Sequence, residues 1–445
     1  MKNKLPTFLL GVLVGAIIVA AGFLIYLNSG SNDAPGGMDK PGGNPPDKPG
    51  ESAEISYSSA EEISKDTTID NGEYSSQSAD ENALAVSGDV TAQLSNITVT
   101  KTGDSDGGDT TSFYGTNSAI IAKDGAKLTL KNISVKTDAT GANGVFCYGG
   151  SATTKNSSSD GTTVTISDSS IETTKDNSGG IMTTGGGVMN ASNLTISTAG
   201  TSSAAIRTDR GGGTVTVDGG TYTTTGKGSP AVYSTANVTV KNAKLVAKAS
   251  EGKNSVTIEN CELTDSNTAL NGQSTTYKNI FLYQSMSGDA DTGTASFAAT
   301  GSTITTEKGD TFYVTNTDAT IELSGNTIVN NDASGNFLRA QKDSWGKDGS
   351  NGGKVTLLMK NQSASGNIVI DSVSTLAMTL QSGSSFEGTI NADNTAKQIT
   401  LTLDSSSKLR LTGDCYVTAL DDADASYANI DFNGYKLYVN GTAIN

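Results

Sequence analysis

The densest group of charged residues that could act in catalysis is the stretch IRTDRGGG, which contains Arg207, Asp209 and Arg210. A polysaccharide lyase needs acidic Ca²⁺ ligands and an arginine or lysine base, and these residue types, together with Arg339, would supply both. A hydrolase would instead need carboxylates that converge on one face, and Asp218 has no clear second carboxylate nearby. A solvated turn in which Asp209 pairs with an arginine explains the same residues. We therefore predict no catalytic residues and keep an enzyme as the alternative.

Aspartates alternate with small residues in two loops, GDSDGGD and GDADTG, a pattern that offers oxygen ligands to Ca²⁺ on a flexible backbone. The candidate ligands are Asp104, Asp106 and Asp109 in the first loop and Asp289 and Asp291 in the second. A third acidic loop contains Asp421, Asp422 and Asp424. None of the three matches an EF-hand loop or a glycine-rich nonapeptide. Solvated loop tips are the simpler interpretation, so we expect no cofactor and keep Ca²⁺ as the alternative.

The composition excludes several kinds of site. Histidine is absent from all 445 residues, which excludes Ser–His and Cys–His pairs and histidine metal ligands. The three cysteines, Cys147, Cys261 and Cys415, are too far apart and too few for a disulfide framework or a zinc site. The formal net charge is −16, whereas nucleic-acid binding needs a cationic surface. We therefore expect no nucleic-acid partner.

The N-terminal segment predicts a membrane anchor. Residues 8–27 are an apolar run of 20 residues, which as a helix would span about 30 Å, the hydrocarbon thickness of a bilayer. Two lysines within residues 1–7 favour a cytoplasmic stub. Residues 28–52 form a Pro/Gly-rich linker, and residues 53–445 the extracellular body with an N-terminal cap. A cleaved signal peptide is the alternative, although its apolar region is usually shorter.

A short module recurs through the body: alternating apolar residues, then a turn residue, then a second alternating strand. Copies include LTLKNISV (128–135), VTISDSSI (164–171) and VTVKNAKL (238–245). Many successive copies lie 22 to 26 residues apart, and a unit of that size with period-2 alternation predicts one coil of an all-β solenoid. The turn positions are Asn96, Asn132, Asp168, Asn193, Gly219, Asn242, Asn260, Gly301, Gly325, Asn361, Gly383, Ser405 and Gly434.

These turn residues share a backbone requirement. Asn and Gly tolerate the left-handed conformation that a tight bend between strands requires. Stacked asparagines can also join their side-chain amides in a ladder along the solenoid. The residues that follow the turn, such as Ile97, Ile133 and Cys261, should then point into the core. Residues 53–81 and the C-terminal DFNGYKLYVNGTAIN are the expected caps of the two ends.

A second strand recurs upstream of the turn module, in segments such as NGVFCYGG, SSAAIRTD and GNFLRAQK. Its first aliphatic residue should face the core and the next residue should face solvent. We predict that these next residues stack into an exposed stripe that binds a glycan through rings and guanidinium groups. The predicted ligand-binding residues are Ile121, Phe146, Met182, Arg207, Tyr233 and Arg339. Scattered surface hydrophobic residues are the alternative explanation.

Several longer segments, including ADENALAVSGDVTAQLSNITVTKTGD, YKNIFLYQSMSGDADTGTASF and DFNGYKLYVNG, resemble a family of bacterial surface proteins that are usually called adhesin-like. The resemblance implies a pectin-lyase-like, right-handed parallel β-helix displayed at the cell surface, and it transfers no catalytic residue. We expect a single-pass protein of the cell membrane whose body binds an extracellular glycan or another cell-surface ligand. The alternatives are a lyase or hydrolase of acidic glycans and a passive structural protein.

Overall fold

The computed structural model describes residues 55–105, 107–150, 159–247, 255–266, 269–270, 276–284 and 294–445. The predicted cytoplasmic stub, transmembrane segment and linker, residues 1–52, lie outside this part of the chain. Among the described residues, no helix has the length and apolarity that a membrane crossing would need.

The described body is almost entirely parallel β-sheet. Its largest sheet, here the long sheet, has 20 strands that run through nearly every repeat. In order, these are β2 (Thr67–Ser76), β4 (Thr91–Lys101), β6 (Lys127–Lys131), β7 (Ser134–Thr137), β9 (Thr163–Ser167), β10 (Ser170–Thr173), β12 (Gly187–Thr198), β14 (Gly213–Thr224), β16 (Asn237–Lys241), β17 (Lys244–Ala247), β18 (Ser255–Glu259), β19 (Glu262–Asp265), β21 (Thr294–Thr300), β22 (Thr303–Thr306), β24 (Thr317–Ser324), β25 (Thr327–Asn330), β27 (Gly353–Lys360), β30 (Thr375–Gln381), β32 (Gln398–Leu403) and β35 (Ala419–Asp422).

Four smaller sheets complete the coils. The first short sheet contains β1 (Glu62–Ile63), β3 (Leu84–Ser87), β5 (Ile120–Lys123), β8 (Val145–Tyr148), β11 (Ile181–Thr184), β13 (Ile206–Thr208) and β15 (Val232–Tyr233). The second short sheet contains β20 (Lys278–Tyr283), β23 (Asp310–Thr315), β26 (Leu338–Ala340) and β29 (Ile368–Ile370). The last two sheets are β28 (Ser363–Ser365), β31 (Ser385–Gly388), β33 (Lys408–Leu411), β36 (Ile430–Asp431), and then β34 (Cys415–Val417), β37 (Leu437–Val439), β38 (Thr442–Ala443).

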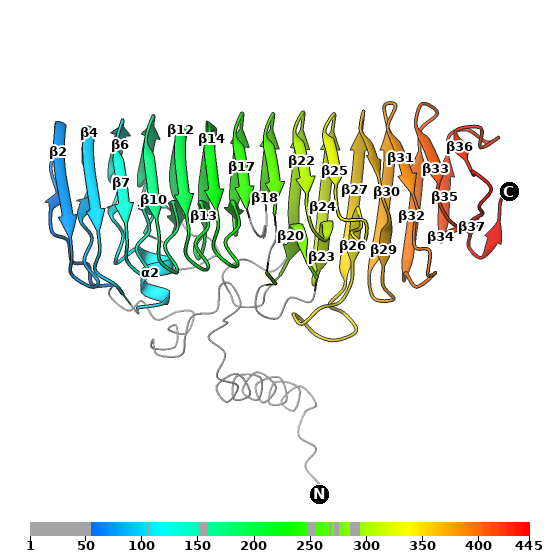
Figure 1. Cartoon of the computed structure of the whole chain (residues 1–445), viewed down its shortest axis with the longest axis horizontal. Coiled ribbons are helices and arrows are strands. Elements are labelled where there is room, and N and C mark those ends of the chain that lie inside the picture. The colour runs from blue at the N-terminus through cyan, green and yellow to red at the C-terminus, as the bar shows by residue number, and fades with distance from the viewer. Residues whose placement is uncertain are drawn as a thin grey trace, which may run out of the picture.

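The pairings place each repeat on the next in constant register. For example, Leu130 of β6 pairs with Ile166 of β9, which pairs with Ala191 of β12. The coils therefore stack side by side along a rod, from β2 at one end to β37 at the other (Figure 1). This all-β arrangement with long parallel sheets is compatible with a parallel β-helix, as the repeat predicts. The inward residues of all coils form one continuous apolar core.

The predicted turn column is confirmed in backbone geometry at all but one position. Twelve of the thirteen turn residues have positive φ, between 49° at Asn361 and 84° at Gly434. Ser405 is the exception, because that coil turns through Asp404 to Ser407, where the Ser407 N–H donates to the Asp404 carbonyl at 3.2 Å. Behind the turns, Ile97 and Ile133 are buried as expected.

The cysteines are buried side chains of the core. Cys147 and Cys261 are 0% and 2% exposed, and Cys147 pairs in register with Thr183. Burial raises the pKa of the Cys147 thiol to about 12, so this thiol stays protonated at neutral pH. The burial of Cys261 confirms the prediction that it points inward, and Cys147 likewise lies in the core as a small hydrophobic residue.

The two ends of the rod differ. Much of the segment expected as the N-terminal cap forms a coil of its own, since β2 pairs along its length with β4. At the other end, β37 pairs in parallel with β34 and then antiparallel with β38. The C-terminal segment therefore closes the stack by turning back on itself.

Candidate ligand-binding site

The predicted stripe exists as a column of residues in register on the outer face of the short sheets. In the first short sheet, Ile121, Phe146, Met182, Arg207 and Tyr233 are successive neighbours across five strands. Arg339 lies in the second short sheet, where it pairs with Tyr313 on one side and Val369 on the other. We call these aligned positions the outward column.

The prediction that this column faces solvent is wrong for five of its six residues. Ile121, Phe146 and Met182 are 0% exposed, Tyr233 is 7% exposed and Arg207 is 8% exposed. A short helix, α2 (Asp109–Tyr114), lies against the strands near the N-terminal end of the rod (Figure 1). A side-chain carbon at Gly115, directly after α2, would come within 2.6 Å of the Phe146 ring, so only glycine permits this close approach.

The N-terminal residues of the described body complete this cover. Ile55, Tyr57 and Tyr114 pack on the cluster that contains Phe146 and Met182, and the Tyr57 hydroxyl donates to the Tyr114 carbonyl at 2.8 Å. The physical reason is that burial also stabilises apolar side chains that point outward from the coil, because their exposure to water is unfavourable. Here the chain buries them under a loop that the strand pattern does not reveal.

The charged group Arg207, Asp209 and Arg210 belongs to the same packed layer. Arg207 Nε donates to Asp209 Oδ2 at 2.9 Å, and Nη2 bonds the same oxygen. Asp209 is 1% exposed, and its Oδ1 accepts the Arg210 N–H at 2.9 Å. The Arg210 guanidinium lies 4.0 Å from the ring centre of Phe113 in α2. Arg207 and Asp209 therefore form a buried ion pair on the sheet, and the contact with α2 is made by Arg210.

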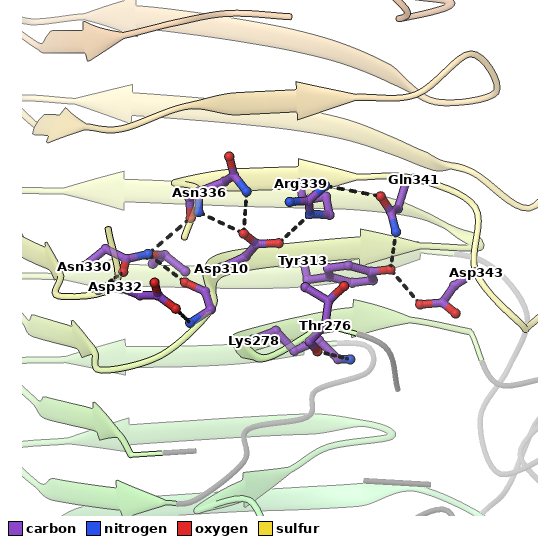
Figure 2. Close-up of polar contacts among 12 residues, drawn as sticks. Thr276, Lys278, Asp310, Tyr313, Asn330, Asp332, Asn336, Arg339, Gln341 and Asp343 are labelled. Carbon is purple, nitrogen blue, oxygen red and sulfur yellow. Dashed lines mark hydrogen bonds and ion pairs between the residues drawn. The ribbon is translucent and has the colours of Figure 1, made fainter. Parts of the chain in front are cut away.

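Arg339 sits in a second polar network (Figure 2). Its Nε donates to Asp310 Oδ2 at 2.6 Å. Asp310 is 1% exposed, and its Oδ1 also accepts the Asn336 N–H at 2.8 Å and Nδ2 at 2.6 Å. The Arg339 side chain remains 24% exposed, so Asp310 fixes one edge of a guanidinium that still reaches solvent.

The aromatic residues beside Arg339 are covered by the loop that follows β26. The Tyr313 hydroxyl donates to Asp343 at 2.6 Å and accepts from Gln341 Nε2 at 2.9 Å (Figure 2). Trp345, in the same loop, packs on Phe281 with ring centres 5.7 Å apart. Burial, and then Asp343, raises the pKa of Tyr313 far above its usual value. This stretch of the outward column is therefore closed to a ligand as well.

The outward column continues beyond Arg339 to an uncovered end. Val369 aligns with Asn391 through the Ile368–Ile390 bridge, and the Tyr416 N–H donates to the Ile390 carbonyl at 3.0 Å, which aligns Tyr416 with Asn391. Tyr416 then pairs with Tyr438. The two tyrosine rings are stacked with centres 4.7 Å apart and planes at 4°, and both side chains are partly exposed.

Our sequence analysis missed this tyrosine pair. The signal was present in CYV and LYV, because each tyrosine follows an inward residue as Phe146 follows Val145. The strands β34 and β37 have three residues each, which is too short for alternation to identify them. Among the described residues, the exposed large hydrophobic side chains are Val329 at 39% and Tyr435 at 40%, and the tyrosine pair is partly exposed.

The predicted Ca²⁺ ligands are only partly within the described residues. Asp104 Oδ1 accepts the Thr140 N–H at 2.7 Å, which is an ordinary turn contact. Asp106, Asp289 and Asp291 lie outside the described part of the chain, as does the side chain of Asp109. Within the described part, no three Cys, Asp or Glu side chains gather in a way that would hold a metal ion.

Comparisons with known proteins give no family for this chain: no family model, curated protein or solved structure matches it.

Proposed function

We propose that this chain is a membrane-anchored, extracellular, right-handed parallel β-helix of the pectin-lyase-like adhesin type, and that it binds a glycan or another cell-surface ligand without cleaving it. The observation that carries the proposal is the end of the outward column, where the rings of Tyr416 and Tyr438 lie parallel and partly exposed. Aromatic faces suit the apolar faces of sugar rings, and the hydroxyls at their edges supply hydrogen bonds.

The partly exposed positions of the column support an extended ligand. Arg339, Val369, Tyr416 and Tyr438 are partly exposed, whereas Asn391 is buried with its Nδ2 donating to the Tyr416 carbonyl at 3.1 Å. At about 4.8 Å per coil the column from Arg339 to Tyr438 spans roughly 19 Å. The partly exposed guanidinium of Arg339 can pair with a carboxylate or hydroxyl of the ligand. A linear glycan that lies parallel to the rod could therefore contact rings at one end and a cation at the other.

Location at the cell surface rests on the sequence of the N-terminal segment. The apolar run of residues 8–27 and the polar Pro/Gly-rich segment after it are suited to hold the body away from the membrane. The negative net charge gives no reason to expect binding to nucleic acid or anionic lipid.

The competing enzyme would use Arg207, Asp209 and Arg210 on an acidic glycan. The buried ion pair of Arg207 with Asp209 disfavours this assignment, because a base or a Ca²⁺ ligand must reach the substrate. A passive structural protein is the second alternative, and the length of the rod suits that function equally well. Measurements of glycan binding and of released products distinguish the adhesin, the enzyme and the structural protein.

The test uses the full chain in detergent micelles on a glycan array, followed by calorimetry with the glycans retained. The double substitution Tyr416→Ala/Tyr438→Ala should weaken binding about fivefold or more, since each ring contributes about 0.5–1.5 kcal/mol. Tyr435→Ala is the matched control, because Tyr435 is exposed nearby but lies outside the column. Unchanged affinity in the double variant would refute the site, and retention of no glycan would favour a structural protein. Unsaturated ends released from polygalacturonate would instead identify a lyase.

A further inference from the structure

A polar groove of about 510 Å³ runs along the turn column, away from the outward column. It crosses the strands β4, β6 and β7, β9 and β10, and β12. Each of these four coils contributes a turn residue of positive φ and a hydroxyl residue two positions later. The pairs are Asn96 with Thr98, Asn132 with Ser134, Asp168 with Ser170, and Asn193 with Thr195.

The hydroxyl residues form a regular array along the groove. Thr98 aligns with Ser134, Ser134 with Ser170, and Ser170 with Thr195. Successive coils are separated by about 4.8 Å, so the four coils present the same pair of polar groups over roughly 14 Å. A ligand that fits this groove must itself repeat along its length.

The asparagine ladder inside the groove has a direction. Asn132 Nδ2 donates to Asn96 Oδ1, and Asn96 Nδ2 donates to Asp70 Oδ1. Asn193 Nδ2 donates to Asp168 Oδ1 at 2.9 Å. Every side-chain amide therefore donates toward the N-terminal end of the rod, and each run ends on an aspartate, which can only accept.

The ladder of side-chain hydrogen bonds is interrupted once in the groove, between Asn132 and Asp168. The two residues lie on adjacent coils, where the Asn132 N–H donates to the Ser167 carbonyl at 3.1 Å. Asp168 has no amide to donate to Asn132 Oδ1, and within the described chain no hydrogen bond reaches that oxygen or Asp168 Oδ2. Both side chains are exposed to solvent, and a partner that brings O–H donors would replace solvent at both acceptors.

We propose that this groove binds a linear, uncharged polysaccharide, whose hydroxyls donate to Asn132 Oδ1 and Asp168 and exchange hydrogen bonds with Ser134 and Ser170. A polysaccharide repeats along its length as the coils do. The carboxylate of Asp168 disfavours uronates and other anionic chains by like-charge repulsion. The site is separate from the tyrosine pair and does not depend on it.

The test is calorimetry of the full chain in detergent micelles with cellohexaose and mannohexaose as uncharged probes and hexagalacturonate as the anionic control. At least one uncharged hexasaccharide should bind, and hexagalacturonate should not. Asp168→Asn should weaken binding at least tenfold, because the new amide would donate to Asn132 Oδ1 and remove the paired acceptors. Ser134→Ala/Ser170→Ala should also weaken it, whereas Ser197→Ala, on the neighbouring exposed position of β12, should not.

Three results would overturn the proposal: no uncharged hexasaccharide binds, the Asp168→Asn variant binds equally well, or Ca²⁺ alone binds at the groove and is lost in that variant. Binding that survives Tyr416→Ala/Tyr438→Ala but not Asp168→Asn would support the groove while refuting the tyrosine site. The reverse pattern would refute the groove and leave the tyrosine site supported.

Discussion

Replacing Asp168 with asparagine should stabilise the coils around it, although it removes a surface charge. Asparagine at this position could donate from Nδ2 to Asn132 Oδ1 and still accept from Asn193 Nδ2. The Asp70–Asn96–Asn132 run and the Asp168–Asn193 run would then join into one continuous ladder. The φ of 52° at residue 168 also suits asparagine.

The size of the effect follows from two opposing terms. A new hydrogen bond contributes about 1 kcal/mol. The existing bond from Asn193 loses its charge-assisted character, which can double the strength of a buried bond, but Asp168 is exposed and solvent screening limits this loss to about 0.5 kcal/mol or less. The net gain should be about 0.5–1 kcal/mol, which corresponds to an approximately two- to fivefold decrease in the population of locally open states.

Hydrogen exchange is the suitable assay, since a long stack of repeats does not unfold in one cooperative step. The backbone N–H groups of residues 132 and 168 donate to the carbonyls of Ser167 and Ser192. Their hydrogen exchange should be about two- to fivefold slower in Asp168→Asn. Asp218→Asn is the matched control, because Asp218 accepts from Asn242 but pairs with Ser192 in the preceding coil rather than with a ladder residue. Exchange that is unchanged or faster in Asp168→Asn would refute the reasoning about the ladder.

Three further predictions concern stability. Phe146→Ala should lower the free energy of local opening of its region by about 3–5 kcal/mol, measured by hydrogen exchange, whereas Met182→Leu should cost less than about 1.5 kcal/mol; equal effects would contradict the packing under α2. Lys101→Met should cost about 1–3 kcal/mol, because Lys101 Nζ donates to the Ser78 carbonyl at 2.6 Å, and proteolysis of the first coils should report it. Burial raises the pKa of Tyr222 and, more strongly, that of Tyr313 above the ordinary value of 10.0, so the folded state holds these protons longer. The contribution of these two protonated tyrosines to the free energy of unfolding is therefore complete below pH 10. Above pH 10 the free energy of unfolding should fall by up to about 1.4 kcal/mol per pH unit for each ring. A free energy of unfolding that stays constant from pH 9 to 11.5 would contradict this.

The repeat made the coil stacking predictable from the sequence, because each strand alternates with period 2 and each bend requires positive φ. Asn96, Asn132 and Asn193 therefore identify the register from the sequence alone. The prediction was wrong at Ser405 because its sequence context resembles that of the other turns. A serine in a four-residue turn needs no positive φ.

The exposure of the outward column was not predictable in the same way. The alternation of apolar residues predicts which side chains point outward from a coil, but it does not predict which other segments cover those side chains. Phe146 is covered by α2, and Tyr313 by the loop that carries Trp345; both covers are irregular segments without a periodic signal. The uncovered Tyr416 and Tyr438 lie on strands too short to be recognised.

The antiparallel pairing of β38 with β37 has a consequence for assembly. A second molecule could lengthen the structure at this end only by laying a parallel strand on the final coil, and the returning C-terminal residues run in the opposite direction there. Strand polarity therefore prevents a parallel coil of another molecule from pairing with β37 at this edge.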